Sequence, residues 1–365
     1  MNVVVVGGGV IGCSIAFHLQ KAGAQVTLLE RGVIGGEASS AAAGMLIAPI
    51  EDTGKRVFDE LRRASLNAYP VLIDEVQRMS KMDVEYKVPG MLRTARSEEA
   101  ARQLKRIGQR QKGFEWVEGL ALRELEPALE EHILGAAYCA TDSDLNPGVL
   151  TQALAKAAEK LGAKVKTKTM LTGFIGRGSH MEGVSTNLGD LRAVDALVLA
   201  AGPWTEPLSL RLSLRLPTPP MRGQMLAYKS KVLRHAIWGE DGYLVPKPRG
   251  QIFAGATIED VGFRKTTTAR ALAGLRRMAT ALVPALSTAS IASSWAGLRP
   301  GTPDGLPIIG RFPGKDNVYV ASGHFRNGVL LAPVTGRLIA DLVCYGRTDR
   351  RLKAFSPERF VKSAV

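Results

Sequence analysis

The sequence predicts an α/β fold made of two domains, and three observations carry this prediction. A β-branched run at residues 3–6 leads directly into a glycine-rich turn and an apolar helical pattern. A second, strongly apolar run at 194–201 has the composition of a strand buried in a parallel sheet. Between 223 and 256 the chain alternates in short segments that indicate a second domain with a mainly antiparallel sheet.

The glycine-rich turn has the spacing G-x-G-x-x-G, with Gly7, Gly9 and Gly12 at its fixed positions. Residues 25–29 resemble a second strand that ends on Glu30. In a Rossmann-type unit the first glycine allows the tight turn, the second lets backbone N–H groups approach a pyrophosphate, and the third lets the helix pack on the strand. The acid at the end of the second strand bonds ribose hydroxyls. This order of elements predicts a dinucleotide-binding unit.

The next segments follow from local signals. Small residues dominate 31–49, as expected for backbone that lies against a flat ligand. Apolar residues at helical spacing predict one or two helices over 55–79. A strand is expected at 86–94, a charged helix at 97–112 with Ser97 as its N-cap, and a short helix at 122–129.

Later elements complete the two domains. Asn146 as N-cap and Pro147 at the first helical position predict a helix to about residue 161, before a strand at 164–168. Further elements are expected as a basic helix at 268–282, a connection at 295–300, a strand at 318–321 and a helix covering 338–343. The predicted boundaries are 1–80, 140–215 and 298–365 for the nucleotide-binding domain, and 81–139 and 216–297 for a discontinuous second domain.

Composition and charge argue against several function classes. The chain has 365 residues, 45% of them hydrophobic and 22% charged, which is typical of a globular protein. The net charge of +14 is dispersed and aromatics make up 6%, so a solvated basic surface is favoured over nucleic-acid binding. Cys13, Cys139 and Cys344 lie far apart, as incidental thiols of a reducing compartment do. Without a signal-peptide pattern, a metal-ligand pattern or a stable membrane segment, a cytoplasmic protein is expected.

Four further motifs go beyond a general dinucleotide fold. They are SSAAAGML at 39–46, LAAGPW at 199–204, AGLRPGTPDG at 296–305 and GHFRNGVLLAP at 323–333. With the first glycine motif, they make the chain similar to the D-amino-acid oxidase family of FAD-dependent oxidoreductases. Within that family it most resembles the glycine-oxidising group of thiamine biosynthesis. The resemblance implies FAD as cofactor, held without a covalent bond because 322–325 offers no cysteine.

The resemblance also implies which residues bind FAD. They are Gly7, Gly9, Val10, Ile11, Gly12, Glu30, Arg31, Ala38, Ser39, Ala43, Gly44, Met45, Leu171, Gly202, His324, Phe325, Arg326, Asn327, Gly328, Val329 and Leu330. The helix that follows Asn327 is expected to begin between 327 and 333 and to direct its positive end at the charge of the reduced flavin. For His324 a backbone or packing role is favoured over that of a base.

Three residues are implied to bind the substrate carboxylate and close the pocket, namely Tyr243, Arg299 and Arg326. Arg299 suits a bidentate role because its guanidinium is planar and permanently charged, and the Tyr243 hydroxyl would be a second donor. Tyr243 as an ordinary strand aromatic, and Arg326 as an anchor of the flavin loop, remain alternatives. Ile258 stands where similar sequences have methionine, which leaves the pocket volume open.

The implied activity is oxidative deamination of glycine and other small amines, including sarcosine and small D-amino acids. A hydride passes from Cα to flavin N5, and O2 then yields glyoxylate or another 2-oxo acid, ammonia and H2O2; the glycine imine would feed the thiazole of thiamine. Because the flavin does the chemistry, no catalytic side chain is assigned. A D-amino-acid or proline dehydrogenase that uses an electron carrier, and an FAD-binding partner subunit without turnover, are the alternatives. The resemblance also implies a homo-oligomer, with a tetramer as the specific expectation.

Overall fold

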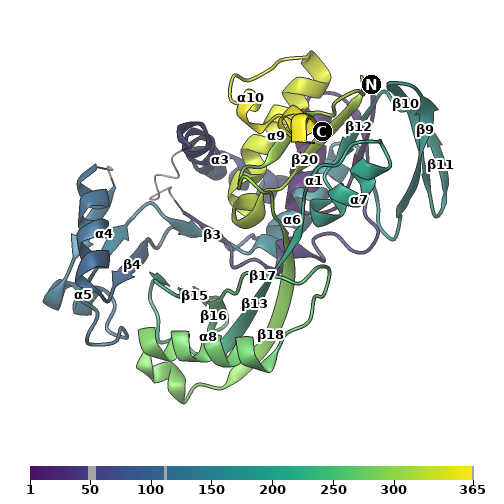
Figure 1. Cartoon of the computed structure of the whole chain (residues 1–365). Coiled ribbons are helices and arrows are strands. Elements are labelled where there is room, and N and C mark those ends of the chain that lie inside the picture. The colour runs from purple at the N-terminus through teal and green to yellow at the C-terminus, as the bar shows by residue number, and fades with distance from the viewer. Residues whose placement is uncertain (48–54, 111–112, 364–365) are drawn as a thin grey trace.

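The computed structural model describes residues 1–47, 55–110 and 113–363. The fold has two halves in space, each built on one large sheet from segments that are far apart in the chain, and the first half contains a mainly parallel sheet (Figure 1). This sheet has the order β19-β20-β12-β1-β2-β8. Its strands are β1 (Asn2–Val6), β2 (Gln25–Leu29), β8 (Lys164–Lys166), β12 (Ala196–Leu199), β19 (Ile308–Arg311) and β20 (Val318–Ser322). All neighbours pair in parallel except β19, which runs antiparallel to β20. The strand order places β1 among the inner strands, so the glycine turn that follows it lies near the middle of the end of the sheet where the strands have their carboxyl termini.

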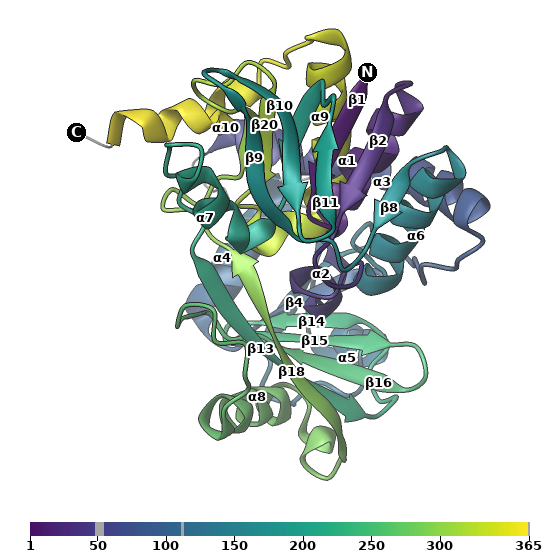
Figure 2. The ribbon, with the colours of Figure 1, turned by 90° about the vertical axis from the view of Figure 1, so that its right-hand side faces the viewer.

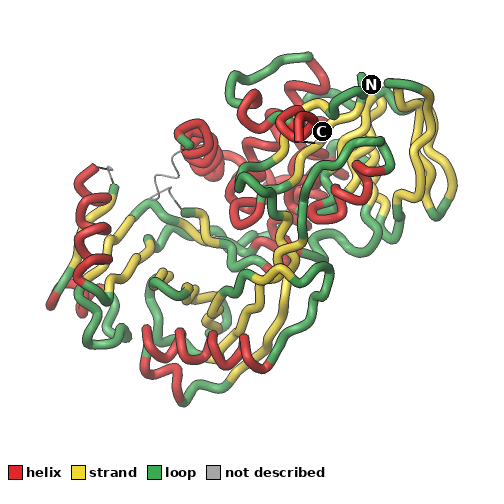
Figure 3. The backbone as a smooth tube through the Cα atoms, in the orientation of Figure 1, coloured by secondary structure: helices red, strands yellow, loops and turns green. Residues whose placement is uncertain are grey.

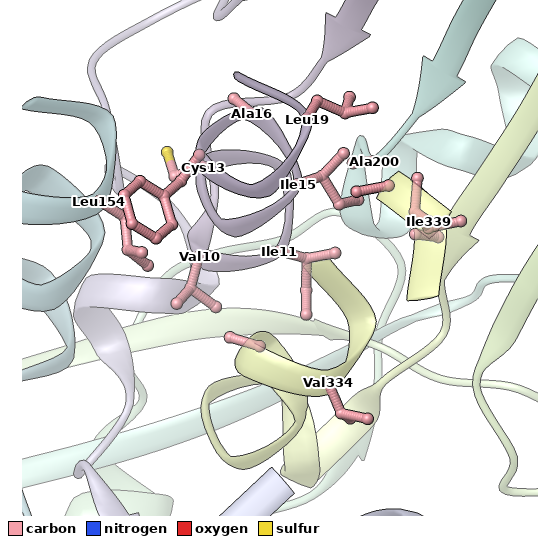
Figure 4. Close-up of a cluster of buried hydrophobic side chains, with 14 of the residues drawn as sticks. Val10, Ile11, Cys13, Ile15, Ala16, Leu19, Leu154, Ala200, Val334 and Ile339 are labelled. Atoms are coloured by element: carbon pink, nitrogen blue, oxygen red, sulfur yellow. The ribbon is translucent and has the colours of Figure 1, made fainter. Parts of the chain in front are cut away.

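Helices cover one face of this sheet. The central helix is α1 (Val10–Lys21), which packs against α6 (Pro147–Lys160) and α9 (Gly328–Tyr345), while α3 (Arg56–Ser80) packs on α6 and α9. Ile11 and Ile15 of α1 lie beside Val334 and Ile339 of α9, and Leu154 of α6 lies on the other side of α1 (Figure 4). The stretch Phe325–Tyr345 is long and apolar enough to cross a membrane, yet 72% of its apolar window is buried inside the fold. That burial is typical of a core helix.

A small antiparallel sheet covers the opposite face. It consists of β9 (Leu171–Arg177), β10 (His180–Thr186) and β11 (Gly189–Arg192), which the sequence signals did not predict. Its buried residues Met181 and Val184 share one apolar cluster with Val4 and Val6 of β1. The short α7 (Thr205–Leu210) follows β12 and the turn at Gly202–Trp204. The predicted α/β fold class, with its Rossmann-like domain, is thereby confirmed.

The second half is built on a nine-stranded sheet that is antiparallel apart from the pair β4–β14. Its strands are β4 (Met91–Ala95), β5 (Phe114–Val117), β6 (Gly135–Cys139), β13 (Pro220–Lys229), β14 (Ala236–Gly239), β15 (Gly242–Lys247), β16 (Gln251–Gly255), β17 (Glu259–Asp260) and β18 (Ile291–Pro300). The helix α8 (Ala269–Leu282) packs on it, and α4 (Glu98–Arg110) and α5 (Gly119–Leu125) lie at its far end (Figure 1). The long strands β13 and β18 rise side by side from this sheet toward the first one (Figure 2).

A short ribbon joins the two halves. It consists of β3 (Met45–Leu46) and β7 (Ser143–Asp144), and the tube in Figure 3 shows it between the two groups of strands. Lys247 of β15 contacts Asp144 in a buried ion pair and donates a further hydrogen bond to the Leu145 carbonyl at 3.0 Å. The domain boundaries given above stay a prediction; β18 crosses the one placed between 297 and 298.

Several local expectations need correction. The strand expected at 86–94 is confined to 91–95, because Pro89 has no N–H to donate and Gly90 has a left-handed φ of 79°. Residues 295–300 are not a connection but the end of the ten-residue strand β18. The helix expected at 122–129 spans 119–125 and ends before Pro127. The segment 55–79 forms one helix, which continues through Pro70 to Ser80.

Helix caps follow the predictions closely. The Asn146 side chain accepts a hydrogen bond from the Val149 N–H at 3.2 Å at the start of α6, with Pro147 at its first position. The Ser97 hydroxyl accepts one from the Ala100 N–H, also at 3.2 Å. Residues 111 and 112, in the predicted helix 97–112, and 48 and 49, in the predicted small-residue segment, lie outside the described residues.

Candidate active site

A cavity extends from the carboxyl end of β1 to the second sheet, and residues of both halves line it. Two glycines shape its start for steric reasons. Gly7 adopts φ +114°, and a Cβ there would overlap the carbonyl of Ala200; a Cβ on Gly12 would overlap the carbonyl of Gly7. Gly12 thus allows α1 to pack on the turn and does not itself line the cavity. The first turn of α1, with Val10 and Ile11, faces the cavity with its positive end.

Glu30 follows β2 directly and lines the cavity at the same carboxyl end of the sheet. Its Oε2 accepts a hydrogen bond from the Gly8 N–H and its Oε1 accepts one from the Gly32 N–H, both at 2.7 Å. The carboxylate is therefore held in a fixed orientation beside the glycine turn. Beside it, the Ser39 hydroxyl accepts a hydrogen bond from the Val10 N–H at 2.9 Å. The turn, the acid and the next segment of the chain form one hydrogen-bonded unit.

The segment 38–45 forms the wall of the cavity between the two halves. It begins with the short helix α2 (Ala38–Ala41) and reaches Gly44 at φ +92°, where a Cβ would overlap the Leu145 carbonyl. The indole of Trp295 in β18 donates a hydrogen bond to the Ala41 carbonyl at 3.1 Å. Ala38, Ser39, Ala43, Gly44 and Met45 all line the cavity. The second sheet thus supports the segment 38–45 through the bond from Trp295.

Arg299 and Tyr243 lie at the inner end of the cavity. Arg299 belongs to β18, and its Nη1 donates a hydrogen bond to the Thr257 carbonyl at 3.0 Å. Tyr243 belongs to β15, and its hydroxyl contacts the Met225 sulfur at 3.3 Å. Burial raises the pKa of Tyr243 and lowers that of Arg299, and the two side chains lie close enough to influence each other's charge. A guanidinium keeps its proton in proteins, so the pair consists of a neutral phenol and a cation.

Arg326 lies at the mouth of the cavity. Its guanidinium is over the ring of Trp238, 5.2 Å from the ring centroid, and Trp238 in turn lies 5.5 Å from the Tyr243 ring. Arg326 is exposed, whereas Arg299 is half-buried. The cavity therefore presents one half-buried and one exposed guanidinium, with the rings of Tyr243 and Trp238 between them. The two guanidiniums at this part of the cavity attract a small anion and offer it planar hydrogen-bond donors.

Comparison with known proteins assigns this architecture. A family model described as FAD dependent oxidoreductase (DAO) matches residues 2–342. The chain belongs to the DAO family. It is 35% identical to a glycine oxidase of Bacillus licheniformis, over 100% of this chain and 98% of that protein. The crystal structure of glycine oxidase from Geobacillus kaustophilus superimposes with a TM-score of 0.91 at 34% identity and covers 97% of each chain.

A further relative is a bifunctional protein. The chain is 34% identical to a bifunctional protein ThiO/ThiG of Nostoc sp., over 100% of this chain and 56% of that protein. The predicted resemblance, the FAD cofactor and the FAD-dependent amino-acid oxidase class are confirmed by these relationships.

The residues of the cavity fit FAD in this DAO family member. The start of α1 directs its positive end at the place where a pyrophosphate would lie, although the Val10 N–H itself is bonded to Ser39, and the oriented Glu30 carboxylate would supply acceptors for ribose hydroxyls. Arg31 and Leu171 flank that end, and Gly202 lines it from the end of β12. We propose that these residues, with Gly7, Gly9 and the wall 38–45, hold FAD.

The start of α9 completes the proposed flavin site. The helix begins at Gly328, inside the expected window, and Phe325, Arg326, Gly328 and Val329 line the cavity. His324 is buried and its Nε2 lies 3.1 Å from the Thr335 hydroxyl. Burial lowers the pKa of His324 to about 3, so the imidazole is neutral at physiological pH. Its bonding to α9 agrees with the packing role expected for it.

Three residues of the expected FAD set do not line the cavity: Gly12, Asn327 and Leu330. Leu330 faces the core instead, and its carbonyl accepts a hydrogen bond from the Ser65 hydroxyl at 2.6 Å. Ile258 is 51% exposed and also lies outside the lining, so the structure gives it no influence on the volume of the cavity.

Sequence reasoning missed other residues that line the cavity, above all Trp204, Trp238 and Gly223. Trp204 carried a usable signal, since it follows a buried parallel strand at the edge where ligands bind. Trp238 and Gly223 carried no usable sequence signal, because their positions depend on the pairing of β14 with β15 and of β13 with β18.

Proposed function

We propose that this chain oxidatively deaminates glycine and other small amines, such as sarcosine and small D-amino acids. Glycine, O2 and water would give glyoxylate, ammonia and H2O2. The observation that carries the proposal is the pairing of Arg299 with Tyr243 at the inner end of a cavity whose other end fits a dinucleotide. The activity of the named relatives supports it.

The proposed role of the inner end is to hold a small zwitterion by its carboxylate. The Thr257 carbonyl fixes Arg299 from one side, which leaves its remaining N–H groups to form charge-assisted hydrogen bonds with the carboxylate. The neutral Tyr243 hydroxyl would donate another hydrogen bond. Arg326, exposed at the mouth, would draw the anion inward and close over it.

Bound FAD supplies the acceptor for the hydride that leaves Cα. The chain's contribution is orientation: a carboxylate held at Arg299 and Tyr243 directs Cα toward the wall 38–45 and the start of α9. The aromatic rings of Trp238 and Tyr243 restrict the space beside Cα, which favours substrates with small side chains. His324, neutral and bonded to Thr335, is not assigned as a base.

The wider setting is also part of the proposal. The relationship to a ThiO/ThiG protein supports a role in which the glycine imine feeds the thiazole of thiamine. We propose a cytoplasmic homo-oligomer, with a tetramer as the specific expectation, and no nucleic-acid partner. Light scattering coupled to size exclusion checks the oligomeric state.

An anaerobic substrate panel tests the activity. Glycine, sarcosine, D-alanine and D-proline are each added to the holoenzyme, the flavin absorption band is followed, and air is then admitted. Bleaching by glycine, with return of the band and stoichiometric H2O2 in air, is the expected result. Bleaching that air does not reverse would instead identify a dehydrogenase that uses an electron carrier. A band that no amine bleaches would identify an FAD-binding subunit without turnover.

A further inference from the structure

A pair of side chains bridges the sheet directly above the glycine turn. The guanidinium of Arg31 lies 3.7 Å from the ring centroid of Trp204. Arg31 follows β2 and Trp204 follows β12, and these two strands flank β1 and end level with it at Leu29, Val6 and Leu199. The contact therefore spans the carboxyl end of β1, where the dinucleotide is expected to enter the fold.

A loop of the second half reaches across to this bridge. The loop covers 261–268, between β17 and α8. The Phe263 ring packs on Trp204 with 5.3 Å between centroids. The Lys265 ammonium forms an ion pair of 2.7 Å with Glu37, which also pairs with Arg31 at 3.1 Å, and it donates a hydrogen bond to the Gly36 carbonyl at 3.2 Å. The loop of the second half thus contacts Trp204 directly and Arg31 through Glu37.

The base of the loop is firmly anchored to the long strand β13. The Arg222 guanidinium donates a hydrogen bond to the Thr266 carbonyl at 3.0 Å and pairs with Glu259. The Gln224 side chain accepts a hydrogen bond from the Thr268 N–H at 2.7 Å. The loop therefore has fixed ends on β13, and Phe263 and Lys265 at its tip contact the other half of the molecule.

We propose that Phe263 and Lys265 form a latch that retains FAD. The cofactor cavity is lined by Arg31, Gly36, Glu37 and Trp204. A dinucleotide that leaves along the glycine turn therefore has to separate the side chains of Arg31 and Trp204. The latch opposes that movement through one aromatic contact and one ion pair. The proposal depends on FAD as cofactor and is independent of which amine is oxidised.

The test is the rate of FAD release from the holoenzyme, followed by the rise in flavin fluorescence after dilution. The variant Phe263→Ala/Lys265→Ala is expected to release FAD about tenfold faster, since an aromatic contact and an exposed ion pair are both lost. Arg264→Ala is the matched control, because the bond of that side chain is to Val261 in its own loop. Its release rate should stay within about twofold of wild type.

A double-mutant cycle separates a latch from a general loosening of the loop. Lys265→Met and Glu37→Gln are measured singly and together. A latch predicts that the effect of the double variant is smaller than the sum of the two single effects, because the two side chains share one ion pair. Added salt should also speed release from wild type more than from Lys265→Met. Unchanged release from the Phe263→Ala/Lys265→Ala variant, or additive effects in the cycle, would overturn the proposal.

Discussion

The guanidinium of Arg299 donates a hydrogen bond to the backbone carbonyl of Thr257 at 3.0 Å. This bond fixes the side chain before any substrate arrives, and the neighbouring Tyr243 hydroxyl, which donates to the Met225 sulfur at 3.3 Å, is the proposed second donor to a carboxylate. A guanidinium that is already oriented loses little conformational freedom when it binds a carboxylate. The relationship supports the proposed role of Arg299 in selecting a small zwitterion.

Arg299→Lys should raise KM for glycine about 100-fold, with FAD still bound. An ammonium cannot keep the Thr257 bond and also form a planar, bidentate pair with a carboxylate. Steady-state kinetics with glycine give KM, and the absorption spectrum reports bound flavin. A KM within threefold of wild type would contradict the assigned role.

Gly223→Ala should also raise KM for glycine, although it replaces no charged residue. Gly223 lies under Arg299, and a Cβ there would overlap Nη1, Nη2 and Cζ of the guanidinium. The arginine would have to move away from Thr257. Gly274→Ala in α8 is the control, since a Cβ there meets one atom, 3.9 Å away, and alanine favours the helix. Equal KM values for the two variants would show that Arg299 tolerates displacement.

Glu30→Gln should weaken FAD binding about tenfold. The two carboxylate oxygens each accept a backbone N–H, from Gly8 and Gly32, and an amide NH2 would face one of these donors. Fluorescence titration of the apoprotein with FAD gives Kd. Glu75→Gln, whose partner is Lys21 on the protein surface, is the matched control. Unchanged FAD affinity would remove Glu30 from the proposed site.

His18 should make the fold less stable in mild acid. Burial lowers its pKa to about 4, against a backbone hydrogen bond to Ser14 that raises it. The unfolded chain takes up a proton near its ordinary pKa of about 6.5, so this stability is complete above that pH and is lost as the pH falls toward 4. The loss at pH 5 is about 2 kcal/mol.

Urea unfolding of wild type and His18→Gln at pH 7.5 and pH 5, with constant FAD, measures this difference. The variant should lose about 2 kcal/mol less than wild type between the two pH values. Identical losses would show that the native fold does not lower the pKa of His18.

Local sequence signals predicted one end of the site well. The turn at Gly7, the start of α1 and the cap at Asn146 depend on backbone sterics and hydrogen bonds within a few residues. The family resemblance placed Arg299 and Tyr243 at the substrate end, and both line the cavity. The strand pairing of the second sheet was harder to foresee, and β18 was expected to be a connection.

By itself, the sequence determined the α/β class and the dinucleotide-binding turn, because these rest on short segments whose geometry is set by their own residues. It determined the FAD-dependent family through the resemblance of its motifs to that family. Only the tertiary structure decided that Gly223 lies beneath Arg299, that Trp238 joins Tyr243 to Arg326, and that Phe263 reaches Trp204. Each of these contacts joins strands or loops far apart in the chain. Their positions follow from strand register and the packing of two halves, which no local pattern specifies.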